Sequence, residues 1–455
     1  MEIAEVPYQP LEAALPDTGA YVLLKTGRVT PWDRWSILGW DPWCKWVPAA
    51  GGDPFAELQV ILDAIHKEAK APIGTIPLPL LMVAFAYDAG RAIEAIPATA
   101  RTVAPLPDAI FFGFRRYLIA DEADRRAWAV EFAPGEQFAE TRRVMHGDGR
   151  QVSGTLSDGG AARSMGEGYP EPTRPEPIDP CSGRIYGQSN FARKTYAAAV
   201  EAIREMIAAG DLYQVNLSQQ FQTSSARTAA EIFRAALERN PAPMMALVNA
   251  GDFQIISTSP ERLVAKRGDR LISRPIKGTR PRGGTPEEDA ALREELLTHP
   301  KDNAELAMIV DLIRNDLGRV AAPGSVVVEE PCVTESYANV HHLLATISAR
   351  ARADATWPSI LRAVFPGGSI TGCPKVQAMR VIEQMEGVRR GFYCGSIGYI
   401  SANGNGDWNI AIRTITKIGD KAFFNLGGAV VYDSDPAGEY EETLHKGRTL
   451  FEILR

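Results

Sequence analysis

The pattern of hydrophobic and polar positions predicts a strand-rich N-terminal region. Residues 20–24 and 34–38 form two strand-like runs around a turn, and further strands are expected at 78–87, 109–120 and 126–132. Among these runs, the apolar residues of 53–70 recur at helical spacing, which predicts one amphipathic helix.

After residue 189 the pattern predicts both helices and strands. Helices are expected from about 189 to 209, at 228–239, at 302–319 and from about 439 to the end, and strands at 212–217, 244–248, 253–258 and 262–267. Residues 392–432 have the alternation and turns of an antiparallel meander. Together these elements predict an α+β fold, with large antiparallel β-sheets in a sandwich-like arrangement surrounded by helices.

The composition changes between these two regions. From 146 to 188, Gly, Ser, Pro, Arg and Glu dominate and apolar residues almost vanish. Such a segment cannot bury enough surface to offset its ordering entropy, which predicts a mobile linker. The expected organisation is therefore an N-terminal region at 1–145, the linker at 146–188, and a region at 189–455 that contains every dense motif.

The overall composition excludes several classes of function. The chain has 455 residues, of which 45% are hydrophobic, and a net charge of −7. Nucleic acids and anionic membranes require a basic surface, so neither is expected as a partner, and no run is apolar enough to span a membrane. The N-terminus lacks signal-peptide features and the five cysteines form no CxxC pair, which indicates a reduced, cytoplasmic protein.

One lysine stands in an unusual context. The stretch 274–284 contains two prolines and three glycines, which predicts a rigid, turn-rich loop, and Lys277 lies between Ile276 and Gly278 within it. A lysine held there can lose hydration, which lowers the pKa of its amine and makes it nucleophilic. The plainer interpretation is a solvated basic loop, and this stretch alone favours it.

Carboxylates provide a second candidate site. Glu305 lies near the start of the 302–319 helix, whereas Glu439, Glu442 and Lys446 share one face of the last helix. Taken separately, they are typical of a helix-dipole partner and of a solvated face with an ion pair. If Glu305 and Glu442 converge, however, they form with water and a substrate carboxylate the oxygen site that Mg²⁺ prefers.

Three further features have plain and functional interpretations. Glu261 follows Pro260 in a turn, from which it either enters a cleft or remains a surface residue. His342 stands beside His341 in an apolar run, where a core histidine is the default. The glycine-rich stretch 365–375 precedes a helix, and its backbone amides can hold an anion.

An ordered set of blocks resembles the chorismate-utilising enzyme family. The blocks are 213–217, 259–262, 275–279, 304–305, 308–316, 365–375, 395–399, 410–414 and 433–443, and they cover almost all of 189–450. The order of the whole set, rather than any single motif, carries the resemblance. It implies the fold of that family and an enzyme that acts on chorismate.

Two positions indicate a branch of the family. Lys277 stands where the anthranilate-forming branch has alanine, and it matches the branch that makes 4-amino-4-deoxychorismate for p-aminobenzoate and folate; residues 86–91 agree with that branch. Gln214 stands where members that add water place a lysine base, and a neutral amide suits ammonia. Anthranilate formation is the main alternative. Isochorismate formation and a silent chorismate-binding subunit are weaker ones.

The resemblance also implies roles for individual residues. Mg²⁺ held by Glu305 and Glu442 binds the ring carboxylate of chorismate. The amine of Lys277 attacks C2 while Glu261 handles the proton of the departing C4 hydroxyl, and ammonia then adds at C4 and expels the lysine. The catalytic position His342 and the substrate-binding positions Gln214, Gly278, Thr279, Tyr399, Arg413, Gly427, Gly428 and Lys446 complete the implied site.

Partners and departures follow from the same resemblance. It implies a separate glutaminase subunit as the ammonia source, because nothing in the chain resembles that amidotransferase. A possible regulatory pocket is expected near Thr26, Trp32, Arg34 and Trp35, although Lys25 does not support tryptophan inhibition. Cys373 replaces the usual alanine, and Ala429 replaces the last glycine of a three-glycine run.

Overall fold

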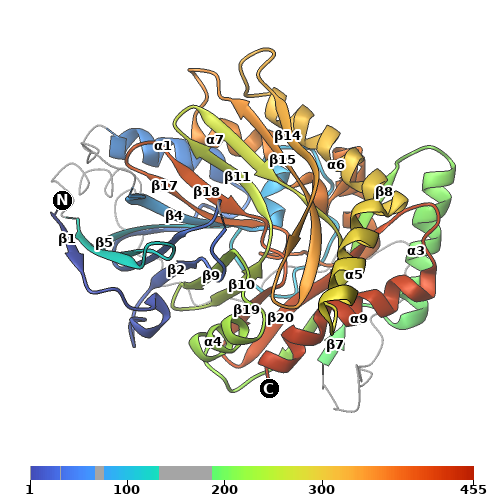
Figure 1. The fold of residues 1–455 in the computed structure, drawn as a ribbon, viewed down its shortest axis with the longest axis horizontal. Helices are drawn as coiled ribbons and strands as arrows, with labels where there is room; N and C mark the ends of the chain where they lie inside the picture. The colour runs from blue at the N-terminus through green and yellow to red at the C-terminus, as the bar shows by residue number, and fades with distance from the viewer. Residues whose placement is uncertain (1, 31, 67–75, 133–186) are drawn as a thin grey trace.

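Two layers of antiparallel strands form the centre of the molecule (Figure 1). The computed structural model describes residues 2–30, 32–66, 76–132 and 187–455. Every pairing between its named strands is antiparallel. Such a ladder can leave one face for a core and the other for helices.

The first sheet combines strands from both ends of the chain. Its order is β7 (Gly187–Ser189), β8 (Gln214–Ser224), β20 (Lys421–Val430), β19 (Thr414–Ile418), β10 (Gln254–Ser259), β9 (Met244–Asn249), β2 (Tyr21–Lys25), β3 (Trp35–Trp46), β5 (Ala109–Asp121), β6 (Arg126–Glu131) and β1 (Glu2–Val6). The short strand β16 (Gly372–Cys373) also pairs with β8. N-terminal and C-terminal strands therefore share one ladder.

The second sheet starts from β5 and contains the strands that bear or adjoin Glu261, Lys277 and His342. Its order continues through β4 (Pro79–Phe85), β17 (Ser396–Ser401), β18 (Gly406–Asn409), β11 (Arg262–Arg267), β12 (Arg270–Arg274), β15 (Val340–Arg350) and β14 (Val327–Ser336). Beyond β12, β13 (Ile276–Pro281) pairs with β15. Because β5 pairs with β4 through its first residues and with β6 through its last, it joins the two layers.

Helices cover the outer faces of both sheets. The second sheet packs with α1 (Pro54–His66), α6 (Pro300–Gly318) and α7 (Trp357–Val364), and the first with α4 (Ala229–Arg239), α9 (Pro436–Ile453), α3 (Arg193–Ala208) and α8 (Lys375–Glu386). One cluster, which includes Ile37, Phe112, Val248 and Ile397, lies between the sheets. The predicted α+β fold with large antiparallel sheets is confirmed.

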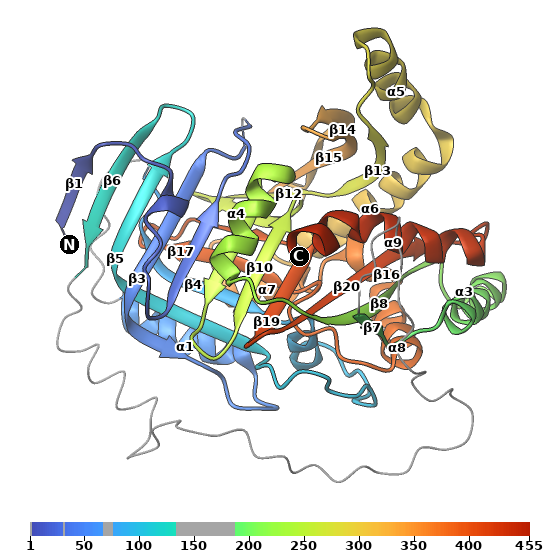
Figure 2. The ribbon, with the colours of Figure 1, turned by 90° about the horizontal axis from the view of Figure 1, so that it is seen from below.

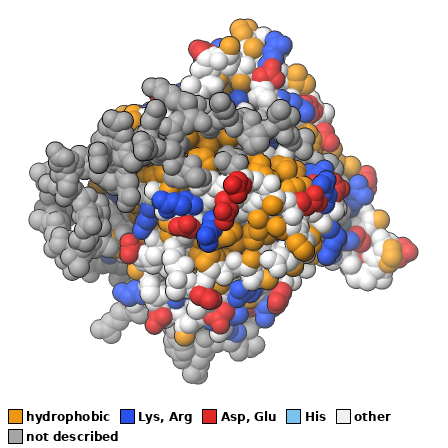
Figure 3. Space-filling view, turned by 90° about the vertical axis from the view of Figure 1, so that its left-hand side faces the viewer, with side chains coloured by type: hydrophobic (Ala, Val, Ile, Leu, Met, Phe, Trp, Pro, Cys, Tyr) orange, Lys and Arg blue, Asp and Glu red, His pale blue; other side chains and the backbone are white. Residues whose placement is uncertain are grey.

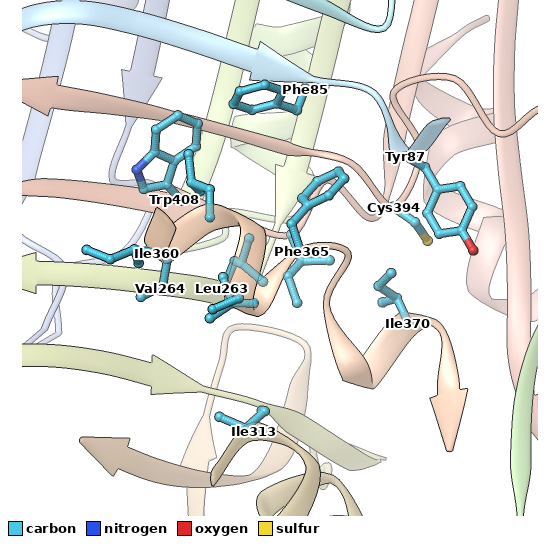
Figure 4. Packing of buried hydrophobic residues seen from close by; sticks show 14 of the residues in the cluster. Phe85, Tyr87, Leu263, Val264, Ile313, Ile360, Phe365, Ile370, Cys394 and Trp408 are labelled. Atoms are coloured by element: carbon cyan, nitrogen blue, oxygen red, sulfur yellow. The ribbon is translucent and has the colours of Figure 1, made fainter. Parts of the chain in front are cut away.

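Aromatic residues fill the core beneath the glycine-rich stretch 365–375. Phe365 packs against Phe85 with ring centroids 6.1 Å apart, and Figure 4 shows both near Leu263 and Trp408. Ile370 points into the same cluster from η3 (Gly368–Ile370). The stretch is therefore anchored by its own apolar side chains on both sides of its glycines.

One face of the molecule lies over the N-terminal strands. Figure 3 shows that hydrophobic side chains gather on this face between scattered charged groups, on the side away from α3 and α9. None of the described helices is long and apolar enough to cross a membrane.

The stretch 274–284, predicted as a loop, forms the edge strand β13 and the turn that follows it. Prolines have no N–H to donate, so they are tolerated on an edge strand, and among the described strands β13 pairs only with β15. A register shift between Lys277 and Thr279 marks a bulge, where Gly278 has a φ of +73°. The proline rule excluded a central strand but not an edge strand.

The helices that follow also differ from the prediction. The pattern missed α5 (Pro286–Thr298), which buries only Leu296 and projects from the body in Figure 2. Helix α6 begins at Pro300 with His299 as its N-cap, so Glu305 lies in the second turn rather than the first. Most of the predicted linker at 146–188 lies outside the described residues, and its last two residues begin β7.

A fully buried ion pair joins both regions of the chain. Arg390 Nη2 lies 2.6 Å from Glu386 Oε1, and both side chains are 1% exposed. The guanidinium also donates to the carbonyls of Ile370 and Asn216, at 3.0 and 2.6 Å, and lies 4.7 Å from the centroid of the Tyr87 ring. Glu386 in turn accepts from the backbone N–H of Ser218 on β8 at 2.8 Å. This pair ties the glycine-rich stretch to the first sheet.

Replacing Arg390 with methionine is expected to destabilise the protein by about 3–5 kcal/mol, because Glu386 would be left buried without its partner. The double variant R390M/E386Q removes both charges and is expected to recover part of that loss. Urea unfolding followed by circular dichroism measures both. A double variant no more stable than the single one would contradict the role of the unpaired carboxylate.

Candidate active site

The amine of Lys277 lies against the glycine-rich stretch. From β13 its Nζ donates to the carbonyl of Ser369 at 3.3 Å. Burial lowers the pKa of Lys277, and the carboxylates of Glu305 and Glu261 act in the opposite direction. No carboxylate oxygen of the described residues lies within ion-pair distance of this amine, so the neutral, nucleophilic form is accessible.

Glu261 is held in a fixed position beside that lysine. The hydroxyl of Ser259 accepts from the Glu261 N–H at 3.1 Å and donates to the Ile410 carbonyl at 2.6 Å, which fixes the turn after β10. The side chain is 3% exposed, and its Oε1 accepts from the Ile276 N–H at 3.4 Å. Burial raises the pKa of Glu261 to about 7, although Ser369 and Lys277 lower it. Glu261 can therefore both give and take a proton near neutral pH.

The position of the Ser369 carbonyl depends on β8. The N–H of Asn216 donates to the Thr371 carbonyl at 2.8 Å, and Gly372 pairs with Val215. A Cβ on Gly372 would lie 2.1 Å from the Gln214 carbonyl oxygen, so only glycine allows this approach. The acceptor for Lys277 is thus positioned by a strand of the other sheet.

Gln214 provides an unused amide at the same junction. Its side chain is fully buried, and neither its Oε1 nor its Nε2 has a hydrogen-bond partner among the described residues. Buried polar atoms are normally satisfied, so a ligand or water is expected there. Opposite Gln214 stands Cys373, whose thiol pKa is raised by burial.

His342 and Arg413 form a polar wall next to β13. His342 Nδ1 lies 2.9 Å from the hydroxyl of Thr279, and its Nε2 is buried without a partner in the described part of the chain. Burial, assisted by the charge of Arg413, lowers the pKa of His342 to about 3, so the ring is neutral at neutral pH. Burial also lowers the pKa of Arg413, which forms no ion pair with the described carboxylates. An unpaired guanidinium suits a substrate carboxylate.

Helix α9 brings two carboxylates and a lysine to β20. A Cβ on Gly428 would lie 3.0 Å from Glu439 Oε2, 3.6 Å from Glu442 Oε1 and 3.7 Å from Lys446 Nζ. Lys446 Nζ lies 2.5 Å from Glu442 Oε1 and donates to the Gly427 carbonyl at 3.3 Å. This pair is half-exposed, and such pairs contribute only about 0–1 kcal/mol.

The charges of these carboxylates also reach the lysine on β13. Glu305 and Glu442 both raise the pKa of Lys277, which places α6, α9 and β13 around one region. Burial would raise the pKa of Glu442, but the Lys446 ammonium outweighs it and holds that pKa below its usual value. Burial raises the pKa of Glu439, whose Oε2 has no partner among the described residues.

These donors fit a divalent cation that takes further ligands from water or substrate. Among the described residues, no three His, Cys, Asp or Glu side chains are already gathered around one point. The unpartnered oxygen of Glu439 and the adjacent carboxylate of Glu442 nevertheless provide oxygen donors beside Gly428. Mg²⁺ usually binds through one or two carboxylates and keeps several waters.

Tyr399 lies apart from this group. It lines a separate pocket between the sheets, together with Thr26, Trp32, Arg34 and Trp35. The sequence motifs predict Tyr399 beside the substrate, and the other four residues in a possible regulatory pocket. The structure brings all five together, because Tyr399 and Ile397 occupy the inward face of β17.

Two residues of the site have no counterpart in the sequence-based prediction. Ser369 accepts from Lys277, and Tyr337 packs edge-on against His342 with ring centroids 5.0 Å apart. Glu439, expected on a solvated helix face with Glu442, contributes an oxygen that has no partner among the described residues. The roles of Ser369 and Tyr337 depend on non-local packing, for which the sequence has no signal.

Strand β20 accommodates Ala429, which replaces the last glycine of the three-glycine run expected from the resemblance. Ala429 pairs with Asn216 on β8, and Gly427, two residues earlier, is the position where a Cβ would meet the Leu217 carbonyl at 2.5 Å. Close backbone approach is therefore required at Gly427, and Ala429 remains half-buried in the same strand.

Comparisons with known proteins agree with this architecture. The chorismate binding enzyme model matches residues 32–452. The chain is 35% identical to anthranilate synthase component 1 1 of Haloarcula marismortui, over 98% of the chain and 89% of the relative. It is 36% identical to aminodeoxychorismate synthase component 1 of Escherichia coli, over 88% of the chain and 83% of the relative. The crystal structure of anthranilate synthase component I from Streptococcus pneumoniae TIGR4 matches with a TM-score of 0.75 and 27% identity, over 94% of this chain and 93% of that one.

A buried acid, a partly desolvated lysine and an unpaired arginine on two antiparallel layers define an enzyme site for a small anionic substrate. The chain belongs to the chorismate binding enzyme family. The resemblance found in the sequence is confirmed, and the protein is an enzyme that acts on chorismate. Relatives of two branches match at nearly equal identity, so the branch is argued from the site.

The raised pKa of Glu261 predicts a pH-dependent cost to stability. A carboxyl whose folded pKa is about 7 instead of 4.5 binds its proton more tightly in the folded state, so stability falls as pH rises through this interval, by about 3 kcal/mol. E261Q removes this dependence and should be more stable than the wild type above pH 7 and similar below pH 4.5.

Urea midpoints of both proteins at pH 4.5, 6 and 8 test this expectation. The difference between E261Q and the wild type should grow with pH. An equal difference at all three pH values would contradict the assignment of this titration to Glu261.

Proposed function

We propose that this enzyme aminates chorismate at C4 to give 4-amino-4-deoxychorismate, the precursor of p-aminobenzoate in folate synthesis. The observation that carries the proposal is the state of the Lys277 amine. This amine donates to the Ser369 carbonyl beside Glu261, and burial lowers the pKa of Lys277. The resemblance assigns this position to a covalent nucleophile in the C4-aminating branch and to alanine in the anthranilate branch. The E. coli relative named aminodeoxychorismate synthase component 1 supports the same branch.

The first half of the proposed reaction uses Lys277 and Glu261. The neutral amine forms a bond to C2 of chorismate, both ring double bonds shift, and the C4 oxygen leaves as water with the proton of Glu261. Burial favours both starting forms, because it disfavours the charged lysine and the charged carboxylate. Glu261 is then a carboxylate beside the cationic adduct.

The second half reverses the bond to the enzyme. Ammonia forms a bond to C4, both double bonds shift back, and the C2 bond to Lys277 breaks to release its neutral amine. The new ammonium gives its proton to Glu261, which restores the acid. Gln214 fits this step because its amide can hydrogen-bond ammonia without acting as a base.

Other residues orient the substrate in this proposal. Arg413 binds a carboxylate of chorismate, and neutral His342 contributes a hydrogen bond from its unpartnered Nε2. Thr279 fixes the His342 ring. Glycine is required at position 278 because side chains of α5 and α6 leave no space for a Cβ. A Cβ on Gly278 would lie 2.9 Å from Leu296 and 3.0 Å from Asp302.

We include Mg²⁺ and a glutaminase in the proposal. Glu305 and Glu442, with Glu439 beside them, would hold the ion, which when bound supplies positive charge to the ring carboxylate. The relatives are named as component 1, which supports a second component. A glutaminase subunit would supply the ammonia.

The product distinguishes this proposal from anthranilate formation, which the Haloarcula relative supports. With chorismate, Mg²⁺ and ammonium, the wild type should form a compound that becomes p-aminobenzoate only after an aminodeoxychorismate lyase is added. Fluorescent anthranilate formed without the lyase would refute the proposal.

Replacing Lys277 with alanine is expected to reduce aminodeoxychorismate formation by a factor on the order of 10³ or more, because the covalent step is lost. K266A is a matched control: Lys266 is also a half-buried lysine with a lowered pKa, but it bonds the Gly404 carbonyl far from the site. Chromatography of the products measures both. Unchanged aminodeoxychorismate formation by K277A would refute the covalent role.

A further inference from the structure

The ammonium of Lys446 already contacts Glu442, one of the two carboxylates that would hold Mg²⁺ in the proposed function. Lys446 Nζ lies 2.5 Å from Glu442 Oε1, and it also donates to the Gly427 carbonyl at 3.3 Å. Seen from Gly428, the Glu439 oxygen, the Glu442 oxygen and this ammonium lie within 3.0 to 3.7 Å of one point. The Lys446 ammonium therefore already contacts the Glu442 oxygen that would bind a metal.

We propose that Lys446 is an exchangeable internal cation: it neutralises Glu442 in the metal-free protein, leaves Glu442 when Mg²⁺ binds, and then becomes free to meet a carboxylate of the substrate. This inference rests on the proposed function, in which Glu305 and Glu442 hold the ion. It makes Lys446 a positioning residue for the metal and a binding residue for the substrate in turn.

Competition between the two cations follows from geometry and charge. An oxygen that accepts an ammonium at 2.5 Å has no room for a metal on the same side, and two cations at one carboxylate repel each other. The Lys446 side chain is 48% exposed and flexible, so it can leave without becoming a buried unpaired charge. Glu439 Oε2, which has no partner in the described part of the chain, remains available to the incoming ion or its waters.

Lys301 provides a matched control. Its charge acts on both Glu439 and Glu442, yet it forms an ion pair with neither among the described residues. Removing Lys301 therefore changes the field at the carboxylates without emptying a ligand position. Removing Lys446 changes the field and also frees the Glu442 oxygen for a metal.

The test measures Mg²⁺ affinity by calorimetry, and Mn²⁺ affinity by electron paramagnetic resonance, on the full-length wild type, K446M, K446R and K301M. K446M should bind the ions about threefold or more tightly than the wild type, because the competing ammonium is gone. K446R keeps a competing cation and should remain close to the wild type. K301M should gain less than about twofold, as expected for a screened surface charge.

A second readout separates exchange from a general change in structure. At saturating Mg²⁺, the KM of K446M for chorismate should rise while its metal dissociation constant falls, because the substrate loses the released ammonium. K301M should leave that KM unchanged. Opposite movement of the two constants is not expected from partial unfolding, which would weaken both.

Each outcome decides the inference. Unchanged metal affinity in K446M, or an equal gain in K301M, would overturn the exchange while leaving the proposed amination and its metal site intact. A wild type that aminates chorismate but binds neither ion would overturn the metal site and the exchange together. A wild type that forms only anthranilate would overturn the proposed product without affecting the metal competition.

Discussion

The buried pair of Arg390 and Glu386 is the constraint on which the site depends. Both side chains are 1% exposed, so their hydrogen bonds must all be made within the protein. Arg390 makes them to the Ile370 and Asn216 carbonyls, and Glu386 to the Ser218 N–H. These contacts fix η3 on β8, and η3 presents the Ser369 carbonyl to Lys277. Lys277, the proposed nucleophile on one sheet, is thereby positioned through an ion pair anchored on the other.

Around this anchor, the site keeps charges that stability alone would not favour. Glu261 is buried with a raised pKa, Arg413 forms no ion pair with the described carboxylates, and the Gln214 amide has no partner there. The folded protein would be more stable if each of these groups were paired or replaced by an apolar residue. A doubly charged substrate and a cation can satisfy all of them at once. The residues that weaken the fold are therefore the ones to which the proposed function assigns substrate binding and proton transfer.

Much of this arrangement could be predicted from the sequence. Hydrophobic alternation and helical periodicity identified most strands and the helices α4, α6 and α9, because their apolar faces are continuous. The ordered motifs identified Lys277, Glu261, Glu305 and Glu442, whose charges the structure brings into one region. Their catalytic roles remain predictions.

The rest depends on contacts between distant parts of the chain. The sequence predicts a loop at β13 because the two prolines of 274–284 are typical of turns, although an edge strand also tolerates them. The pattern gives no signal for α5, because this helix buries a single leucine. Tyr399 was grouped with the substrate because a motif does not reveal which face of β17 it occupies. Ser369 contributes a backbone carbonyl, which residue identity cannot indicate.

The central claim is that Lys277 becomes covalently bonded to the substrate. Mass spectrometry of the protein mixed with chorismate and Mg²⁺ in the absence of ammonia, quenched and digested, tests it most directly. The account predicts a modification on the peptide that contains Lys277, with the mass of chorismate less one water, which disappears when ammonium is added. An unmodified Lys277 peptide in a preparation that still aminates chorismate would contradict it.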